Sequence, residues 1–157
     1  MKKYLIVFLI SMVPLIELRG AIPYAVGFGL PIVPSLVVSV IGNMLPVPFI
    51  FLFARRILDW GKDKKYIGGF CRWCLEKGAK GGRKLEEKAG RGLYVALLLF
   101  VGIPLPGTGA WTGTLAASML DLDFRKSVIY VLLGVLLAGA IMLAASLGVF
   151  GAVNFLR

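Results

Sequence analysis

Histidine is absent from this 157-residue chain, and cysteine occurs only twice. Without histidine the chain lacks the commonest metal ligand and the usual proton carrier at neutral pH, so haem and histidine-based zinc or iron sites are not expected. Cys71 and Cys74 form a single CRWC pair, which supplies half of a four-cysteine zinc site. We interpret the pair as two small apolar residues on one helix face, with a zinc site completed by a second chain as the alternative. No metal and no cofactor is predicted.

Charged residues are scarce over long stretches of the chain. Apolar residues make up 59% of the sequence and the mean hydropathy is +0.87, values that exclude an ordinary soluble domain. Basic residues outnumber acidic ones by 18 to 8, but twelve of the eighteen lie between residues 55 and 91. Such a basic segment is typical of a cytoplasmic loop beside anionic lipid headgroups. The composition therefore predicts an integral membrane protein that contacts membrane lipids and binds no nucleic acid.

An uncharged apolar run over residues 92–120 contains the string VGIPLPGTGAWTG, residues 101–113. Its two prolines remove backbone donors and its glycines leave the backbone free to turn, so the middle of the string cannot be helical. Non-helical backbone at membrane depth is tolerated only where protein buries it or where it lines a wet cavity. The string therefore predicts a binding site or a packed interface, with Gly113 as a structural hinge.

A second interruption, VPLIELRGAIP, lies in the apolar run over residues 4–30. It contains Pro14 and Pro23, which we expect to act as hinges. It also contains Glu17 and Arg19, the only charges inside the predicted membrane runs. Charges are costly at that depth, so they are a functional hypothesis by default.

Segment lengths decide between the possible architectures. The arms beside each interruption are ten to thirteen residues long, about 15–20 Å as helix and so about half of a 30 Å hydrocarbon core. We predict two re-entrant hairpins with tips at ELRG and LPGTG, which meet near the midplane from opposite faces. Residues 35–54 and 127–150 are long enough to cross completely. The alternative has four kinked crossings and two parallel halves, and the positive-inside rule does not separate the two models.

The order of break, short connector and long apolar run occurs twice, which is the internal symmetry expected of transporter folds. The predicted fold is an all-α integral membrane domain over residues 1–157 with two inverted repeats, each a re-entrant helical hairpin plus a transmembrane helix. The repeats cover residues 1–54 and 92–157. A basic amphipathic linker, residues 55–91, joins them at the cytoplasmic interface. Its many glycines argue against one long rigid helix.

The two tips together predict a pocket that favours anions. Arg19 offers a fork suited to phosphate or carboxylate, and Glu17 is a group that can take up and release protons. Backbone N–H groups at helix starts after Gly20 and Gly109 point positive dipole ends to the same place. A salt bridge that merely holds the first tip is the alternative. The predicted substrate- or ion-binding residues are Glu17, Arg19, Gly20, Pro104, Pro106, Gly107, Thr108, Gly109, Trp111 and Thr112.

The strings PLIELRGAIP and FVGIPLPGTGAWTG, separated by a basic linker, resemble the small multidrug export protein family, within the DedA-like (SNARE-associated, VTT-type) superfamily. The resemblance covers nearly the whole chain. It implies oppositely inserted re-entrant hairpins and translocation of lipids, including polyprenyl phosphates and phospholipids. Glu17 matches the acidic residue of the superfamily's first hairpin. The arginine of the second hairpin is missing, because Thr108 and Thr112 stand in that region.

We therefore expect a transporter in a prokaryotic cytoplasmic membrane that translocates a lipid or an amphiphilic anion, with proton coupling left open. Proton-coupled efflux of small molecules or drugs through Glu17 is one alternative, and a non-transporting assembly protein is another. An enzyme is not expected, because the hairpins offer one carboxylate and threonines and no catalytic set. A homodimer enclosing the site is a further hypothesis, based on small-residue patches in the last helix.

Overall fold

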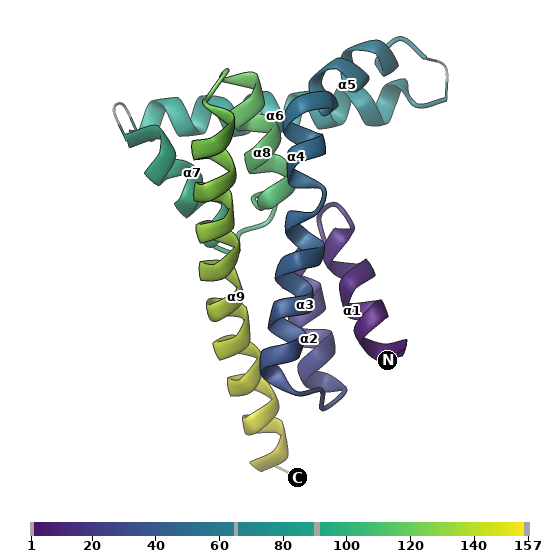
Figure 1. Ribbon diagram of the computed structural model, residues 1–157, viewed down its shortest axis with the longest axis vertical. Coiled ribbons are helices and arrows are strands. Elements are labelled where there is room, and N and C mark those ends of the chain that lie inside the picture. The colour runs from purple at the N-terminus through teal and green to yellow at the C-terminus, as the bar shows by residue number, and fades with distance from the viewer. Residues whose placement is uncertain (1, 65, 90–91, 156–157) are drawn as a thin grey trace.

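The structure is a computed structural model that describes residues 2–64, 66–89 and 92–155, so parts of the predicted linker and of both chain ends lie outside the described residues. Every regular element in the described ranges is helical, as predicted (Figure 1). The elements are α1 (Lys2–Met12), α2 (Glu17–Gly27), α3 (Ile32–Met44), α4 (Val47–Phe49), the π-helix η1 (Ile50–Ala54), α5 (Arg55–Gly61), α6 (Gly68–Ala89), α7 (Leu93–Gly102), α8 (Ala110–Met119) and α9 (Phe124–Phe155).

Two stretches within the described residues are long and apolar enough to cross a membrane. They are Ile32–Phe53, with 22 residues, and Phe124–Val149, with 26. At 1.5 Å per residue they reach about 33 and 39 Å, against a hydrocarbon core of about 30 Å. The two stretches lie side by side and run in opposite directions (Figure 1). They correspond to the two crossings predicted at residues 35–54 and 127–150.

The first crossing is not one regular helix. Pro46 and Pro48 each lack a backbone donor, and the π-helix Ile50–Ala54 follows them directly. Wide helical turns of this kind leave backbone groups that need other partners. Ser118 on α8 provides one, because its hydroxyl donates to the carbonyl oxygen of Phe51 at 2.8 Å. The irregular part of this crossing is therefore tied to α8.

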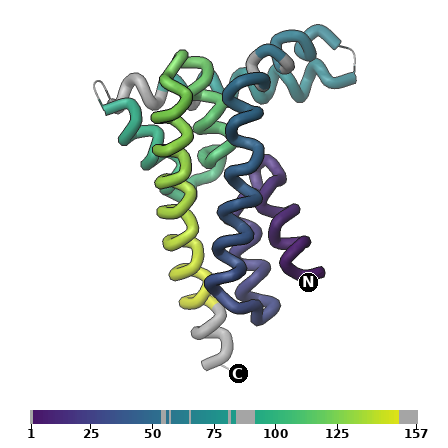
Figure 2. The backbone as a smooth tube through the Cα atoms, viewed as in Figure 1, coloured from purple at the N-terminus to yellow at the C-terminus, as the bar shows by residue number. Residues whose placement is uncertain are grey.

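Two helical hairpins face each other from opposite ends of the molecule. The turn between α1 and α2 points toward the middle, and so does the loop between α7 and α8, which comes from the other end (Figures 1 and 2). The four helices have 10 or 11 residues each, which corresponds to about 15–17 Å. Each hairpin therefore runs along only part of the long helices, and the two tips come together.

The first tip is not the one predicted. The turn comprises residues 13–16, and Glu17–Gly20, predicted as the tip, form the first turn of α2. The chain reverses early because Pro14 lacks the N–H that would continue α1. Leu15 and Glu17 have φ angles of +74° and +52°, and left-handed values cost non-glycine residues about 1–3 kcal/mol each. The second predicted tip, LPGTG, does lie in the loop between α7 and α8.

The linker also differs from the prediction, because α6 is a single helix of 22 residues. It lies across the end of the molecule where α8 ends (Figure 1). Its glycines allow a close approach to α8, and this packing supports the continuous helix. A Cβ atom at Gly78 would lie 2.7 Å from Cγ of Leu115, and one at Gly82 would lie 3.4 Å from Cγ of Leu120. These glycines therefore mark a packing surface between the linker and the second hairpin.

We expect Gly78→Ala to destabilise the protein by about 1–3 kcal/mol, the usual cost of an added methyl group in a packed interface. Gly69→Ala on the same helix is the matched control, since nothing lies within 4 Å of its Cβ position. This control should be neutral or slightly stabilising because alanine favours helix. Thermal unfolding in detergent measures both variants. Equal melting temperatures for Gly78→Ala and Gly69→Ala would contradict the packing.

The apolar core lies where α2, α7 and α9 meet. Gly134 on α9 is part of this contact, since a Cβ atom there would lie 2.7 Å from the carbonyl oxygen of Leu98. The second hairpin is thus fixed to a spanning helix by close packing. The large side chains of the core with at most 1% exposure are Leu18, Val47, Leu97, Val101, Val131 and Val135.

Candidate functional site

Glu17, at the start of α2, reaches into the second hairpin. Its carboxylate accepts hydrogen bonds from the backbone N–H groups of Ala110, at 3.1 Å, and Trp111, at 3.0 Å. The side chain is only 4% exposed. Both oxygens act as acceptors, which suits an ionised carboxylate.

The two N–H groups belong to the first turn of α8, whose own cap residue is Gly109 and supplies no side chain. The first N–H groups of a helix lack partners within it, and the helix dipole favours a negative charge there. Glu17 therefore caps α8 from another hairpin. The anion site predicted at this helix start is occupied by the protein's own carboxylate.

Arg19 binds the other end of the same loop. Its guanidinium donates to the carbonyl oxygens of Leu105, at 2.6 Å, Ile103, at 3.3 Å, and Val101, at 3.4 Å. It also donates to the Thr108 hydroxyl at 2.8 Å. The Val101 carbonyl is in the last turn of α7 and those of Ile103 and Leu105 follow it, where the helix dipole favours a cation. A planar fork with five donors can serve several such oxygens at once.

Glu17 and Arg19 are not paired with each other. No ion pair between them is present among the described residues, and each instead binds one end of the second tip. We call this arrangement, Glu17 and Arg19 with the loop of residues 101–111, the clasp. The predicted meeting of the two interruptions is confirmed by these contacts. The salt bridge within the first tip, considered as the alternative, is not what holds it.

Apart from Trp111 and Thr112, the remaining predicted residues fall into three groups. Gly107 and Gly109 lie in the second tip with φ angles of +80° and +137°, beside Pro104, Pro106 and Thr108. Gly20 packs tightly, since a Cβ atom there would collide with Cγ2 of Ile16. The predicted hinges Pro23 and Gly113 lie inside α2 and α8, whereas Pro14 lies in the turn between α1 and α2.

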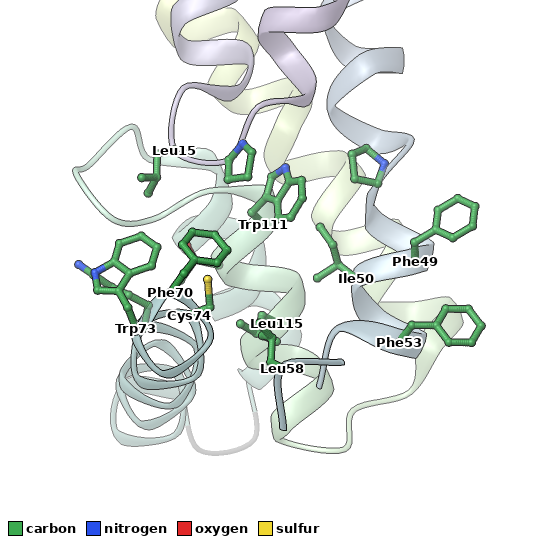
Figure 3. A pocket seen from close by; sticks show the side chains of 14 residues that line it. Leu15, Phe49, Ile50, Phe53, Leu58, Phe70, Trp73, Cys74, Trp111 and Leu115 are labelled. Atoms are coloured by element: carbon green, nitrogen blue, oxygen red, sulfur yellow. The ribbon is translucent and has the colours of Figure 1, made fainter. Parts of the chain in front are cut away.

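Trp111, Thr112 and Pro14 contribute to a cavity of about 420 Å³ beneath the clasp. Figure 3 shows it between the two tips, the π-helix and α6. Apolar and aromatic side chains dominate its walls. Its lining comprises Pro14, Leu15, Pro46, Phe49, Ile50, Phe53, Leu58, Phe70, Trp73, Cys74, Lys77, Trp111, Thr112 and Leu115.

Sequence reasoning missed the part of the cavity that the linker supplies. Phe70, Trp73, Cys74 and Lys77 have the spacing i, i+3, i+4, i+7, which places them on one face of α6. This spacing indicates a packed helix face. From the sequence alone, the apolar side chains on this face of α6 are predicted to lie on the membrane surface. The sequence does not show that α6 packs against the second hairpin.

The CRWC pair, Cys71 and Cys74, lies on the same helix, α6. Cys71 is buried and Cys74 is half-buried, and both are free thiols. Burial, and then the nearby Cys71, raises the pKa of Cys74, so the thiol form predominates at neutral pH. Among the described residues no three His, Cys, Asp or Glu side chains lie together as metal ligands would.

Comparison with known protein families finds a match. A family model described as "Putative small multi-drug export protein" matches residues 17–141. The matched range begins at Glu17 and includes the whole clasp and the cavity-lining part of α6. No curated protein and no solved structure matches the chain.

Proposed function

Because the chain belongs to the small multidrug export protein family, we propose that it is a membrane transporter that carries an amphiphilic molecule, a lipid or an amphiphilic anion, across the bilayer. One observation carries this proposal. The two hairpin tips form adjoining walls of one cavity, and a small set of hydrogen bonds joins them. Two bodies that meet at a few polar contacts can separate and rejoin, which is what alternating access requires.

The walls of the cavity support an apolar substrate. Most of the lining side chains are aliphatic or aromatic, and the only charged group among the described lining residues is Lys77. Nothing in that lining would neutralise a cationic drug. The finer form of our proposal is therefore lipid translocation of the DedA-like type, with a polyprenyl phosphate or a phospholipid as substrate and without enzymatic chemistry.

This mechanism also defines the proposed arrangement in the membrane. The two hairpins would be re-entrant, entering from opposite faces as the two halves of an inverted repeat, while the two long helices cross. The basic surface of α5 and α6 would face the cytoplasm, because cationic residues are retained on that side. Exposed Trp60, Tyr66 and Phe70 are suited to the headgroup region there.

A second candidate function is proton-coupled efflux of cationic compounds. The description of the family favours it, and Glu17 is a buried carboxylate that such a mechanism could use. In this case Glu17 would have to leave the two N–H groups of α8 when it takes up a proton. Arg19 would then matter less than Glu17, and this difference separates the two functions.

Reconstitution tests the choice. We expect wild-type protein in liposomes to move a fluorescent lipid with an anionic head, and Arg19→Ala to slow this at least about tenfold, corresponding to about 1.4 kcal/mol of lost stabilisation. The loss is expected because three carbonyl oxygens and Thr108 lose their donor. Arg72→Ala, at an exposed position on α6 outside the cavity lining, is the control and should transport normally.

The alternatives give other results. Transport of a cationic dye that requires Glu17 and tolerates Arg19→Ala would favour proton-coupled efflux. If folded wild-type protein moves neither lipid nor dye, the chain is better explained as an assembly protein and the transport proposal is wrong.

A further inference from the structure

The clasp leaves no free charge at the tips for a substrate. Arg19 already donates to Leu105, Ile103, Val101 and Thr108, and both oxygens of Glu17 already accept. An anionic head group would have to break these bonds to reach the arginine. A charged substrate group is therefore more easily bound in the cavity beneath the clasp, whose lining does not include Glu17 or Arg19.

The cavity opens at exposed apolar side chains. Leu15, Phe49 and Phe53 line it but are 60%, 64% and 49% exposed. Two of these, Phe49 and Phe53, belong to the first crossing, Ile32–Phe53. Apolar side chains exposed on a membrane-crossing segment face hydrocarbon, so an apolar chain can enter sideways from the bilayer without passing through water. Figure 3 shows these phenylalanines on the side of the cavity opposite Trp73 and Phe70.

Lys77 stands at the other side, between α6 and the second tip. A Cβ atom at Gly107 would lie 3.4 Å from its Nζ atom, and the Nζ lies 5.7 Å from the centre of the Trp73 ring. Among the described residues the structure gives Lys77 no carboxylate partner. Its aliphatic stem can lie along the apolar walls while the ammonium group reaches the second tip. Among the described residues Lys77 is therefore a cation without a carboxylate partner, at one end of an apolar cavity.

We propose that this cavity is the substrate site of the transporter proposed above, and that it binds a bilayer lipid through one hydrocarbon chain with the lipid's anionic head group at Lys77. Calling the lipid a substrate rests on the proposed transport function. The binding site itself is argued only from the cavity and the position of Lys77. A volume of about 420 Å³ is in the range of small-molecule sites, about 300–1,000 Å³. Lys77 is then the residue that selects for a negative head group.

Binding can be measured with the native tryptophans. Trp73 and Trp111 both line the cavity, and a brominated dodecyl phosphate quenches tryptophan fluorescence where it makes contact. In nanodiscs of zwitterionic lipid we expect saturable quenching, and Lys77→Gln should weaken the binding at least about tenfold, which is the effect of losing one charge-assisted contact of about 1.4 kcal/mol. Lys77→Arg should keep most of the affinity. Lys80→Gln, an exposed position on α6 outside the cavity, is the matched control and should bind as wild type.

A second readout needs no change to Lys77. Cys74 lines the cavity and Cys71 is buried, so in a Cys71→Ser background a maleimide reports on the cavity alone. Unbrominated dodecyl phosphate should protect Cys74 from labelling, and dodecyltrimethylammonium should protect it much less. Equal protection by the two amphiphiles would overturn the assignment of Lys77 as the head-group residue.

The outcomes also separate this inference from the proposed function. If Lys77→Gln and wild-type protein are quenched equally, or if Lys80→Gln loses as much affinity, the head-group site is wrong, even if lipid transport is observed. If the binding depends on Lys77 but no lipid moves in liposomes, the site stands and the transport function fails.

Discussion

Replacing Glu17 by glutamine should lower the stability of the protein by about 2–3 kcal/mol and reduce transport at least about tenfold, because each hydrogen bond to a charged group contributes about 1.5–3 kcal/mol. A glutamine side chain has the same shape, but its amide NH₂ must face one of the two N–H groups of Ala110 and Trp111. One helix donor would then be buried without an acceptor. Thermal unfolding in detergent and liposome transport measure the two effects.

Glu76→Gln is the matched control, because Glu76 is an exposed carboxylate on α6. It should change neither stability nor transport, since exposed charges contribute little. A Glu17→Gln protein that unfolds at the same temperature as the wild type would mean that the carboxylate does not bind the N–H groups of α8.

Gly109→Ala should be at least as damaging. Gly109 has a φ angle of +137°, which side-chain-bearing residues rarely adopt, and a Cβ atom there would lie 2.8 Å from Cδ of Glu17 and even closer to one of its oxygens. Backbone strain alone costs about 1–3 kcal/mol, and the carboxylate must also move away from α8. We expect the melting temperature to fall and the transport to disappear.

Gly29→Ala separates the two causes of that loss. Gly29 also has a positive φ angle, +64°, but nothing lies within 4 Å of its Cβ position. This control therefore has a milder, left-handed backbone strain and no collision with Glu17, and it should keep transport activity. If both variants lose stability equally, the contact between Gly109 and Glu17 contributes nothing.

The meeting of the two tips was predictable because its signals are local and strong. Proline and glycine in the middle of an apolar run exclude a regular helix, and a charge in such a run must find a partner. These rules indicated that Glu17 and Arg19 meet the loop around Thr108, and the hydrogen bonds confirm this.

The partners within that meeting were not predictable. The sequence predicts that Arg19 binds a phosphate or carboxylate of a substrate, but Arg19 donates to carbonyl oxygens that are available because α7 ends at this point. The start of α2 at Glu17 depends on left-handed backbone at Leu15 and Glu17, and no residue-type preference indicates such a conformation in these side chains. Tertiary bonds from the other hairpin compensate for that strain.

The cavity was hidden for a different reason. Its wall on α6 has a clear helical spacing, but the same pattern fits a helix that lies on a membrane surface. The glycines that made the linker seem broken, Gly78 and Gly82, are contact points with α8. A glycine in a sequence can indicate either a flexible backbone or a close contact between helices. Only the position of α8 shows that these glycines make a close contact.

The central claim is that Glu17 of one hairpin holds the first turn of α8 in the other, and the amide signal of Trp111 tests it most directly. The chain has three tryptophans, so protein labelled with ¹⁵N-tryptophan gives three backbone amide signals, assigned by Trp111→Phe. We predict that Glu17→Gln moves the Trp111 amide signal strongly and leaves those of Trp60 and Trp73 in place. If the Trp111 signal does not move, or all three move together, the two tips are not joined through this carboxylate.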